Sequence, residues 1–523
     1  MVFRSSGDRP PRWRGRFAVL IAAAVAVTGC TAAPAGPSPA NSDSSQPPAE
    51  ATGGVLRIAA SADAQPQFAM ANRAGNWSWR RLVFDSLVEK DAAGIPQPLL
   101  ATQWSYNDDR TELTLTLQDG VTFHSGRPFT AEDVVFSLGQ VKDPANASQL
   151  AKVAAGIESV SAKSDLEAVI TLVAPSDSLF DLLDLTPVVD SETWAQAADG
   201  KTIVGTGPFL WQSWTPGASI NLTRNDNYWG QNGPYLDEVQ ISIITDATAL
   251  QSALKGGAAD IALGVAQADV ALLKKDPGFA AENAGGVFYP FGFDVTQAPF
   301  DNPLARQAVG YALDRERISE QVFGGDATIS NLWWTPDGPG FPAGEAQHFG
   351  YDPDKAKALL AQAGADGADL TITYANLPVM KSLFEIVQNN LSQVGLNVKA
   401  EALDVAEYDK RQVEGTLGQS FLLLHGMVGF STATIIDAMP SIRAGNPSHF
   451  ESEEYDALKK AVREADDTTR DAAIEALTSY MLEQSFSHIV VVAPQYHVRT
   501  AAVQGLKVVS LGSLVATDVQ LGA

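Results

Sequence analysis

The 523-residue sequence has a single cysteine, Cys30, and only six histidines. One cysteine excludes an intramolecular disulfide. The histidines, at positions 124, 348, 425, 449, 488 and 497, contain no pair at metal-ligand spacing, so we expect no metal site and no cofactor. The alternative is that the protein binds a chelated metal that contacts a single histidine, which would be His425.

Signals of the common enzyme classes are absent as well. The sequence contains no G-x-S-x-G elbow and no H-E-x-x-H pair. Gly200-Lys201-Thr202 resembles the end of a P-loop, but Ala195 stands where its first glycine belongs. Pairs of acidic residues are found throughout a sequence with 61 Asp and Glu, so without their geometry they are no evidence for a hydrolase site. We therefore expect no enzyme, with a surface hydrolase as the least favoured alternative.

Basic residues are scarce, with 36 Lys and Arg and a formal net charge of −25. This excess of negative charge argues against a nucleic-acid partner. We attribute the acidity to solubility at a cell surface rather than to attraction of cations.

Long apolar runs are also missing. The longest, Phe17–Val27, is too short to span a bilayer and follows five arginines, which is typical of a secretory signal over residues 1–29. Val27-Thr28-Gly29-Cys30 then resembles a bacterial lipobox, so we expect Cys30 to be lipidated on the outer face of the cell membrane. The alternative is a short leader whose cysteine is incidental. Residues 30–53 are rich in Pro, Ser and Ala and predict a disordered tether.

From Val55 onward, short β-rich runs alternate with amphipathic helical stretches, which favours an α/β fold. Residues 239–263 predict a strand, a helix capped by Asp246, and a second strand. Residues 370–400 predict another such unit, and their separation suggests two separate sheets. Thr130 with Asp133 predicts a capping box, and Asn302 and Asp352 each precede a proline at a helix start.

Several ordered motifs carry a family resemblance. The most specific is residues 113–137, LTLTLQDGVTFHSGRPFTAEDVVFS, an alternating strand, a glycine turn and a capped helix. Others are residues 205–209, 225–239, 306–315 and 351–356. Together they resemble the peptide- and nickel-class extracellular solute-binding proteins of ABC importers. Two positions differ: the family usually has a basic residue where this sequence has Gln118 and an acidic residue where it has Ser125.

The resemblance implies a two-lobed periplasmic-binding-protein-like fold of type II, the large peptide-binding class, with a subdomain inserted in lobe I. On this basis we expect lobe I at 54–88, 204–290 and 490–523, the inserted subdomain at 89–203, and lobe II at 291–489. It also implies two crossing segments near residues 290 and 490 and a ligand held between the lobes.

Candidate ligand-binding residues are aromatic side chains expected to border the cleft, namely Trp77, Trp79, Trp333 and Trp334, for which ordinary packing is an equal alternative. Adjacent Trp333 and Trp334 would face opposite sides of an extended segment. Trp104, Trp211 and Trp229 are assigned to the scaffold.

One loop departs from the resemblance. The family's peptide receptors usually carry an acid there that pairs with the ligand's ammonium, but here the loop over residues 425–437 reads HGMVGFSTATIID. His425, Phe430 and Asp437 are its candidate ligand-binding residues, and we expect a preference for apolar or blocked ligands.

The implied function is that of a monomeric substrate-binding lipoprotein that delivers a small solute, with peptide or peptide-like compounds as the leading class, to an ABC permease and ATPase. A lipid-anchored ligand sensor or a chaperone on the same fold is the alternative.

Overall fold

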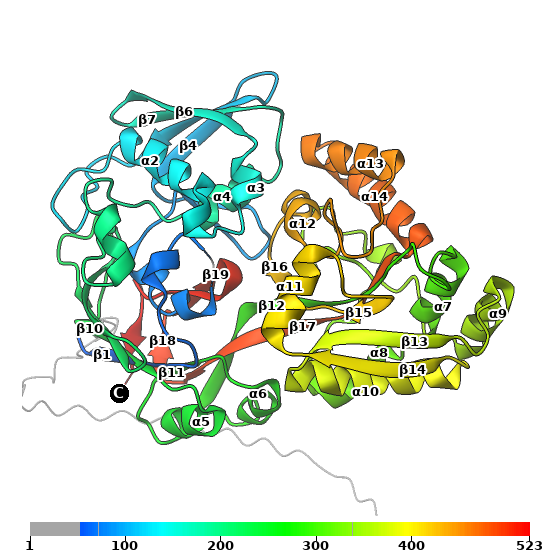
Figure 1. Ribbon diagram of the computed structural model, residues 1–523. Helices are drawn as coiled ribbons and strands as arrows, with labels where there is room; N and C mark the ends of the chain where they lie inside the picture. Colours follow the sequence, from blue (N-terminus) through cyan, green and yellow to red (C-terminus); the bar gives the residue numbers. More distant parts are fainter. Residues whose placement is uncertain (1–52, 72, 337, 523) are drawn as a thin grey trace, which may run out of the picture. The chain divides into compact units, whose positions relative to one another are not determined.

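The computed structural model describes residues 53–71, 73–336 and 338–522, so Cys30, the signal segment and most of the tether lie outside the described residues. Glu50–Ala523 forms a compact unit of its own. Its main element is an eleven-stranded mixed sheet with the order β14-β13-β15-β12-β17-β11-β1-β10-β9-β8, and β16 pairs with β12 (Figure 1). The α/β class expected from the sequence is confirmed.

One half of the sheet, from β11 to β8, is called lobe I below. Its centre is β1, which pairs in parallel with β10 on one side and β11 on the other. Helix α5 connects these two neighbours, and Asp246 caps it by accepting a hydrogen bond from the Ala249 amide at 2.8 Å. The predicted strand-helix-strand unit is therefore present, with β1 between its strands. The bounds are β1 (Val55–Ala60), β8 (Phe209–Thr215), β9 (Ser219–Arg224), β10 (Glu238–Ile243), α5 (Ala247–Lys255), β11 (Ile261–Leu263) and α6 (Gln267–Leu273).

The other half, called lobe II, holds the second predicted unit, β13-α10-β14, with its two strands adjacent and parallel. Helices α7 to α10 bury their apolar faces against these strands in a separate core. The expected caps at Asn302 and Asp352 accept hydrogen bonds from the amides of Leu304 and Lys355. The bounds are α7 (Pro303–Ala312), α8 (Arg315–Phe323), α9 (Pro353–Ala363), β13 (Asp369–Ala375), α10 (Pro378–Gln393), β14 (Asn397–Leu403), α11 (Val405–Glu414), β15 (Ser420–Leu422) and β16 (His425–Val428).

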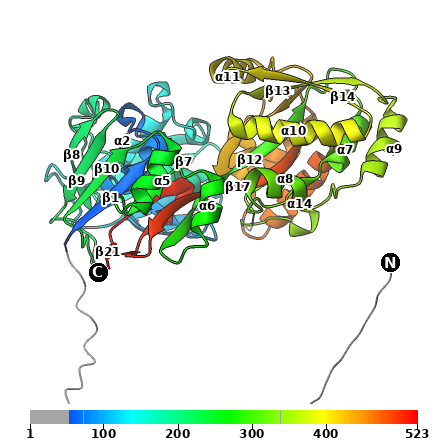
Figure 2. The same cartoon turned by 90° about the horizontal axis from the view of Figure 1, so that it is seen from below.

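Two long strands, β12 (Phe279–Phe293) and β17 (Ser487–Thr500), run from one lobe to the other (Figure 2). They pair antiparallel from Phe279 with Thr500 to Gly292 with Ser487. Because β17 also pairs with β11 and β12 with β15, the hydrogen-bond ladder is continuous. The expectation of two separate sheets is thus wrong, since the strands that connect the lobes are themselves sheet members.

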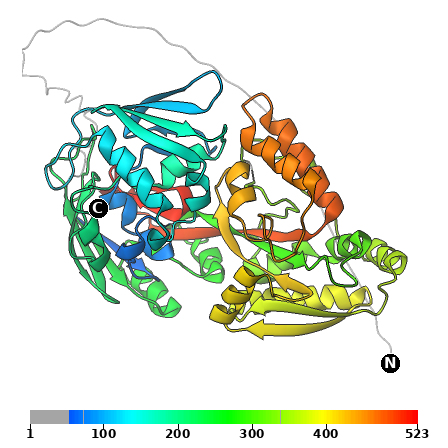
Figure 3. The same ribbon diagram turned by 45° about the horizontal axis from the view of Figure 1, so that its top comes forward.

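A four-stranded antiparallel sheet, β4-β5-β7-β6, stands apart from the main sheet in the chain segment between β1 and β8. Leu113, Leu115 and Leu117 of β5 are buried on one face, as their alternation predicts. This segment and helices α12 to α14 lie on the same side of the crossing strands (Figure 3). The bounds are β4 (Ala101–Tyr106), β5 (Glu112–Leu117), α2 (Ala131–Lys142), α3 (Ala151–Ala154), β6 (Ile157–Ser164), β7 (Glu167–Leu172) and α4 (Leu179–Leu185).

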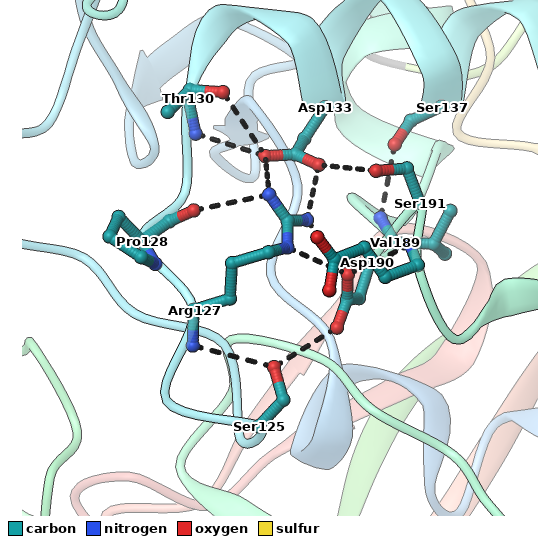
Figure 4. A network of polar contacts seen from close by, with 10 residues as sticks. Ser125, Arg127, Pro128, Thr130, Asp133, Ser137, Val189, Asp190 and Ser191 are labelled. Atoms are coloured by element: carbon teal, nitrogen blue, oxygen red, sulfur yellow. Dashed lines mark hydrogen bonds and ion pairs between the residues drawn. The ribbon is translucent and has the colours of Figure 1, made fainter.

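The predicted capping box at the start of α2 is part of a larger polar network (Figure 4). The Arg127 guanidinium forms ion pairs with Asp133 at the capping position and with Asp190, 2.8 Å away. Ser125, the residue that departs from the family pattern, donates its hydroxyl to Asp190 at 3.0 Å. The Arg127 guanidinium therefore connects the start of α2 to the segment that follows α4.

The remaining elements complete both lobes. Helix α14 packs against α7 of lobe II, and α12 packs against both α13 and α3. Within the described residues, no helix has the length and apolar character needed to cross a membrane. The bounds are α1 (Arg80–Val83), β2 (Val88–Lys90), β3 (Pro96–Pro98), α12 (Thr432–Ala438), α13 (Glu453–Glu464), α14 (Arg470–Gln484), β18 (Val503–Gln504), β19 (Lys507–Val509), β20 (Ser513–Val515) and β21 (Gln520–Leu521).

Candidate functional site

A cavity of about 1450 Å³ lies between lobe II and the chain segment from β2 to α4, which contains the four-stranded sheet and is called the inserted segment below. Its walls come from distant parts of the chain: the β2–β3 turn, β4, the start of α4, the crossing strand β12, and the loop after β16. Residues 335–336 and 338–339, the α13–α14 connection and β19 complete it. A site assembled from both sides of a lobe junction is the usual location of a small-molecule ligand.

One wall is aromatic. Trp104 and Tyr106 lie on the same face of β4, and the Phe180 ring from α4 packs against them with centroids 5.5 Å and 6.5 Å away. All three rings are half-buried and line the cavity. The Arg110 guanidinium lies over the Tyr106 ring at 5.5 Å. Burial raises the pKa of Tyr106 to about 12, so its hydroxyl stays neutral.

Across the cavity, Phe430 occupies the tip of the loop after β16 and is 6% exposed. Thr335 fixes this loop, because its hydroxyl donates to the Phe430 carbonyl and accepts from the Gly429 amide, both at 2.9 Å. These two hydrogen bonds fix the backbone of the loop at Phe430.

The cations of the cavity all have protein partners. Lys90 pairs with Asp181, and Arg110 donates to the Ala465 carbonyl at 2.7 Å. Arg470 pairs with Asp177 at 2.8 Å and with Asp467 at 2.8 Å. Burial alone would lower the pKa of Lys90, but the charge and hydrogen bond of Asp181, together with the charges of Asp184 and Asp177, outweigh burial and raise that pKa, so the ammonium stays charged.

The acids of the cavity are also matched. Arg81 pairs with Glu89 at 2.9 Å, and Asp91 accepts two amides of its own turn. Asp466 accepts the hydroxyls and amides of Thr468 and Thr469. All of these acids have hydrogen-bond donors within the protein, but the donors of Asp91 and Asp466 are neutral, so among the described residues no cation pairs with these two carboxylates.

Of the residues proposed from sequence, Phe430 lines this cavity, and the four tryptophans do not. Trp79, Trp333 and Trp334 are at most 1% exposed. The indole N–H of Trp333 donates to Ser487, and that of Trp334 to Thr478 at 2.7 Å. Both rings lie in one core, contrary to the argument for opposite faces, because the segment is bent rather than extended.

The other three candidates lie elsewhere. Trp77 is half-buried, with its ring 5.8 Å from that of His497. His425 is 7% exposed in β16, and burial, with a contribution from Arg443, lowers its pKa to about 3. Asp437 on α12 accepts two hydrogen bonds from the Nε of Arg463, at 3.0 Å and 3.1 Å.

Sequence reasoning missed the aromatic wall, and it assigned Trp104 to the scaffold. The period-two alternation of β4 places Trp104 and Tyr106 on one face, which is the signal that was available. No local sequence pattern marks Phe180, Lys90 or Asp181 as residues of the site. Among the described residues, no group of three or more His, Cys, Asp or Glu could hold a metal ion.

Comparison with known proteins gives a consistent family. The family model described as bacterial extracellular solute-binding proteins, family 5, matches residues 96–432. The chain is 30% identical to heme-binding protein A of Haemophilus influenzae over 419 residues, covering 72% of this chain and 75% of that protein. It is 25% identical to the dipeptide-binding protein DppE of Bacillus subtilis, covering 82% and 85%.

Among solved structures, the substrate-binding protein CtaP of Listeria monocytogenes superimposes with a TM-score of 0.80 at 21% identity, over 90% of this chain and all of that one. This likeness shows that the two share a fold.

Proposed function

Because the chain belongs to family 5 of the bacterial extracellular solute-binding proteins, we propose that it is the substrate-binding component of an ABC importer. In this proposal it captures a peptide or peptide-like solute between its lobes and hands it unchanged to a membrane permease and ATPase. The observation that carries the proposal is the cavity of about 1450 Å³ with walls from both sides of the lobe junction. The dipeptide-binding relative supports the peptide class.

The size and chemistry of the cavity support a particular kind of solute. Its volume exceeds the roughly 300–1,000 Å³ of ordinary small-molecule sites, so it has room for more than a dipeptide. Its lysines and Arg470 are already paired with acids, and Phe430 lies where the family resemblance leads one to expect an acid. Asp437, the nearest acid in sequence, is paired with Arg463. We propose that the solute presents apolar, aromatic or blocked groups and no free ammonium here.

We further propose Trp104, Tyr106, Phe180 and Phe430 as the ligand-contacting residues. Trp77, Trp79, Trp333, Trp334, His425 and Asp437 then support the walls from behind. The domain boundaries given from the sequence, and anchoring through a lipidated Cys30 on the outer face of the membrane, are part of the same proposal.

The test is native mass spectrometry of the full chain, extracted in mild detergent without denaturation. We expect one bound mass per chain that fragments as a peptide or peptide-like compound. Uptake of that compound, labelled and given to cells with and without the gene, should fall when the gene is deleted. Binding with unchanged uptake would instead indicate a sensor, and turnover of the bound compound would indicate an enzyme; either result overturns the importer assignment.

A further inference from the structure

Asp181 lies at the start of α4 and is 2% exposed, yet three of its hydrogen-bond donors come from the opposite wall of the cavity. Its Oδ2 accepts the Ser431 amide at 2.9 Å, the Ser431 hydroxyl at 2.6 Å and the Thr434 hydroxyl at 2.5 Å. These donors belong to the loop after β16 and the first turn of α12. One buried carboxylate therefore holds three donors across the cavity.

Lys90, at the end of β2, completes the arrangement. Its ammonium, with a side chain 7% exposed, pairs with Oδ1 of Asp181 and donates to the Gly429 carbonyl at 3.0 Å. Phe430 is thus bracketed, because both neighbours in the chain, Gly429 and Ser431, are fixed by the Lys90–Asp181 pair. The position of the loop therefore depends on these two residues, which precede it by more than 240 positions, as well as on Thr335.

The same two walls also meet outside this pair. Helix α12 packs against α3, and their buried side chains belong to one contiguous core. At the rim, Asp177 accepts both Nε and Nη2 of Arg470, at 3.0 Å and 2.8 Å, and its amide donates to the Arg463 carbonyl at 3.0 Å.

From this geometry we infer that the Lys90–Asp181 pair is a closure latch: it docks the inserted segment directly onto the Gly429–Thr434 loop, so that the closed arrangement is the resting state of the chain and Phe430 is positioned before a ligand arrives. The inference rests on the proposed function only in taking the cavity as the ligand site.

The free energy of closure has a clear source. Opening would strip Asp181 of three donors and Lys90 of the Gly429 carbonyl, and breaking a largely buried charged cluster is costly because the charges lose partners before they gain full hydration. A ligand then enters only when these contacts open transiently, so latch variants should accelerate both entry and release of ligand.

Hydrogen–deuterium exchange of the full chain in detergent tests the latch without any ligand. In Asp181→Asn, which keeps the size of the side chain but loses the ion pair, we expect the Ser431 amide and its neighbours in 429–434 to exchange at least about tenfold faster. Faster exchange should extend to the facing segments 151–154 and 463–465. Exchange in β5 and α2, on the inserted segment itself, should not change.

Two further variants make the test decisive. Asp260→Asn removes the partner of Arg57 within lobe I and should leave 429–434 as protected as in the wild type. The double variant Lys90→Met/Asp181→Leu replaces the pair with apolar side chains, which often preserves stability, but supplies no acceptor for Ser431. It should keep the melting temperature and still lose protection at 429–434.

The inference is overturned if 429–434 stays protected in both Asp181 variants, or if β5 and α2 lose protection in step with it, since the pair would then only hold the inserted segment together. Neither outcome bears on solute binding by the wild type, so a failed latch and a failed importer assignment are distinguishable.

Discussion

The Arg463 guanidinium contacts both carboxylate oxygens of Asp437, with its Nη2 2.9 Å from Oδ1 and its Nε 3.0 Å and 3.1 Å from the two oxygens. Two-point pairing of this kind satisfies most of the hydrogen-bonding capacity of a carboxylate. Asp437 also does not line the cavity. The acid nearest in sequence to the missing ammonium clamp is therefore engaged within the protein.

This pairing leads to a prediction about specificity. Calorimetric titration of matched peptides, free and N-acetylated, should show tighter binding of the acetylated form, because an ammonium beside Phe430 would be desolvated without a partner, at a cost of several kcal/mol. Tight binding of the free amine, lost on acetylation, would contradict the prediction and point to another acid as the clamp.

Phe430 and Trp333 should respond differently to truncation. Phe430→Ala should weaken ligand binding, because Phe430 lines the cavity, and should lower stability by less than Trp333→Ala, because the ring it removes is smaller and less completely buried. Trp333→Ala should lower stability by about 3–5 kcal/mol, as for large buried aromatics, because its ring is completely buried in the core. Differential scanning calorimetry together with titration separates the two. Equal losses of stability would mean that Phe430 is core rather than wall.

Local features of this fold could be predicted from the sequence because they depend on neighbours in the chain. The caps at Thr130, Asp246, Asn302 and Asp352 need only a few adjacent residues, and both strand-helix-strand units are visible as changes of period. The continuity of the sheet could not be predicted, because β12 and β17 pair over about 200 residues and no local pattern encodes that register.

The candidate site shows the same division. Phe430 was found because it interrupts an expected motif. The pair Lys90–Asp181 was missed because its members are 91 positions apart and each reads alone as an ordinary surface charge. The residue type alone could not tell which tryptophans line the cavity, because aromatic side chains are suited equally to a core and to a pocket. Only the packing of the folded chain places Trp334 in the core and Trp104 in the cavity wall.

The network at Arg127 allows a stability prediction. Arg127→Met should destabilise the chain by roughly 3–5 kcal/mol, because Asp133 and Asp190, each with a side chain 1% exposed, would lose their common cation. Arg57→Met is the matched control: Arg57 is 44% exposed, so its loss should cost less than about 1 kcal/mol. Chemical denaturation of both variants checks the difference, and equal effects would refute a special role for the buried network.

The anchor can be tested in cells. Cys30→Ala should abolish acylation and release the protein from the membrane fraction, because a thioether-linked lipid requires the thiol at that position. Metabolic labelling with a fatty acid and fractionation measure both effects. A variant protein that is still acylated and retained by the membrane would show that the anchor lies elsewhere.

A final prediction concerns acid stability and His488. This imidazole is 1% exposed, donates its Nε2–H to the Arg306 carbonyl 2.8 Å away, and packs edge-on against Phe293 and Phe349. Burial, together with the nearby charges of Arg315 and Arg306, lowers its pKa to about 3 in the folded chain. In the unfolded chain the pKa returns to about 6.5, so the unfolded state binds the extra proton first on acidification.

The sign of the effect follows from that difference. Stability from neutral His488 is complete above pH about 6.5 and is lost as the pH falls towards 3, by up to about 1.4 kcal/mol per pH unit. His488→Gln should therefore flatten the dependence of unfolding free energy on pH between about 6 and 4 by that amount, even though it lowers stability at neutral pH. Ile489→Val, a neighbouring buried substitution that introduces no titrating group, should lower stability equally at all pH values in this range. If His488→Gln keeps the full wild-type slope while Ile489→Val behaves as expected, the acid sensitivity comes from other groups, for instance His124 and His497, whose pKa values burial lowers to about 4.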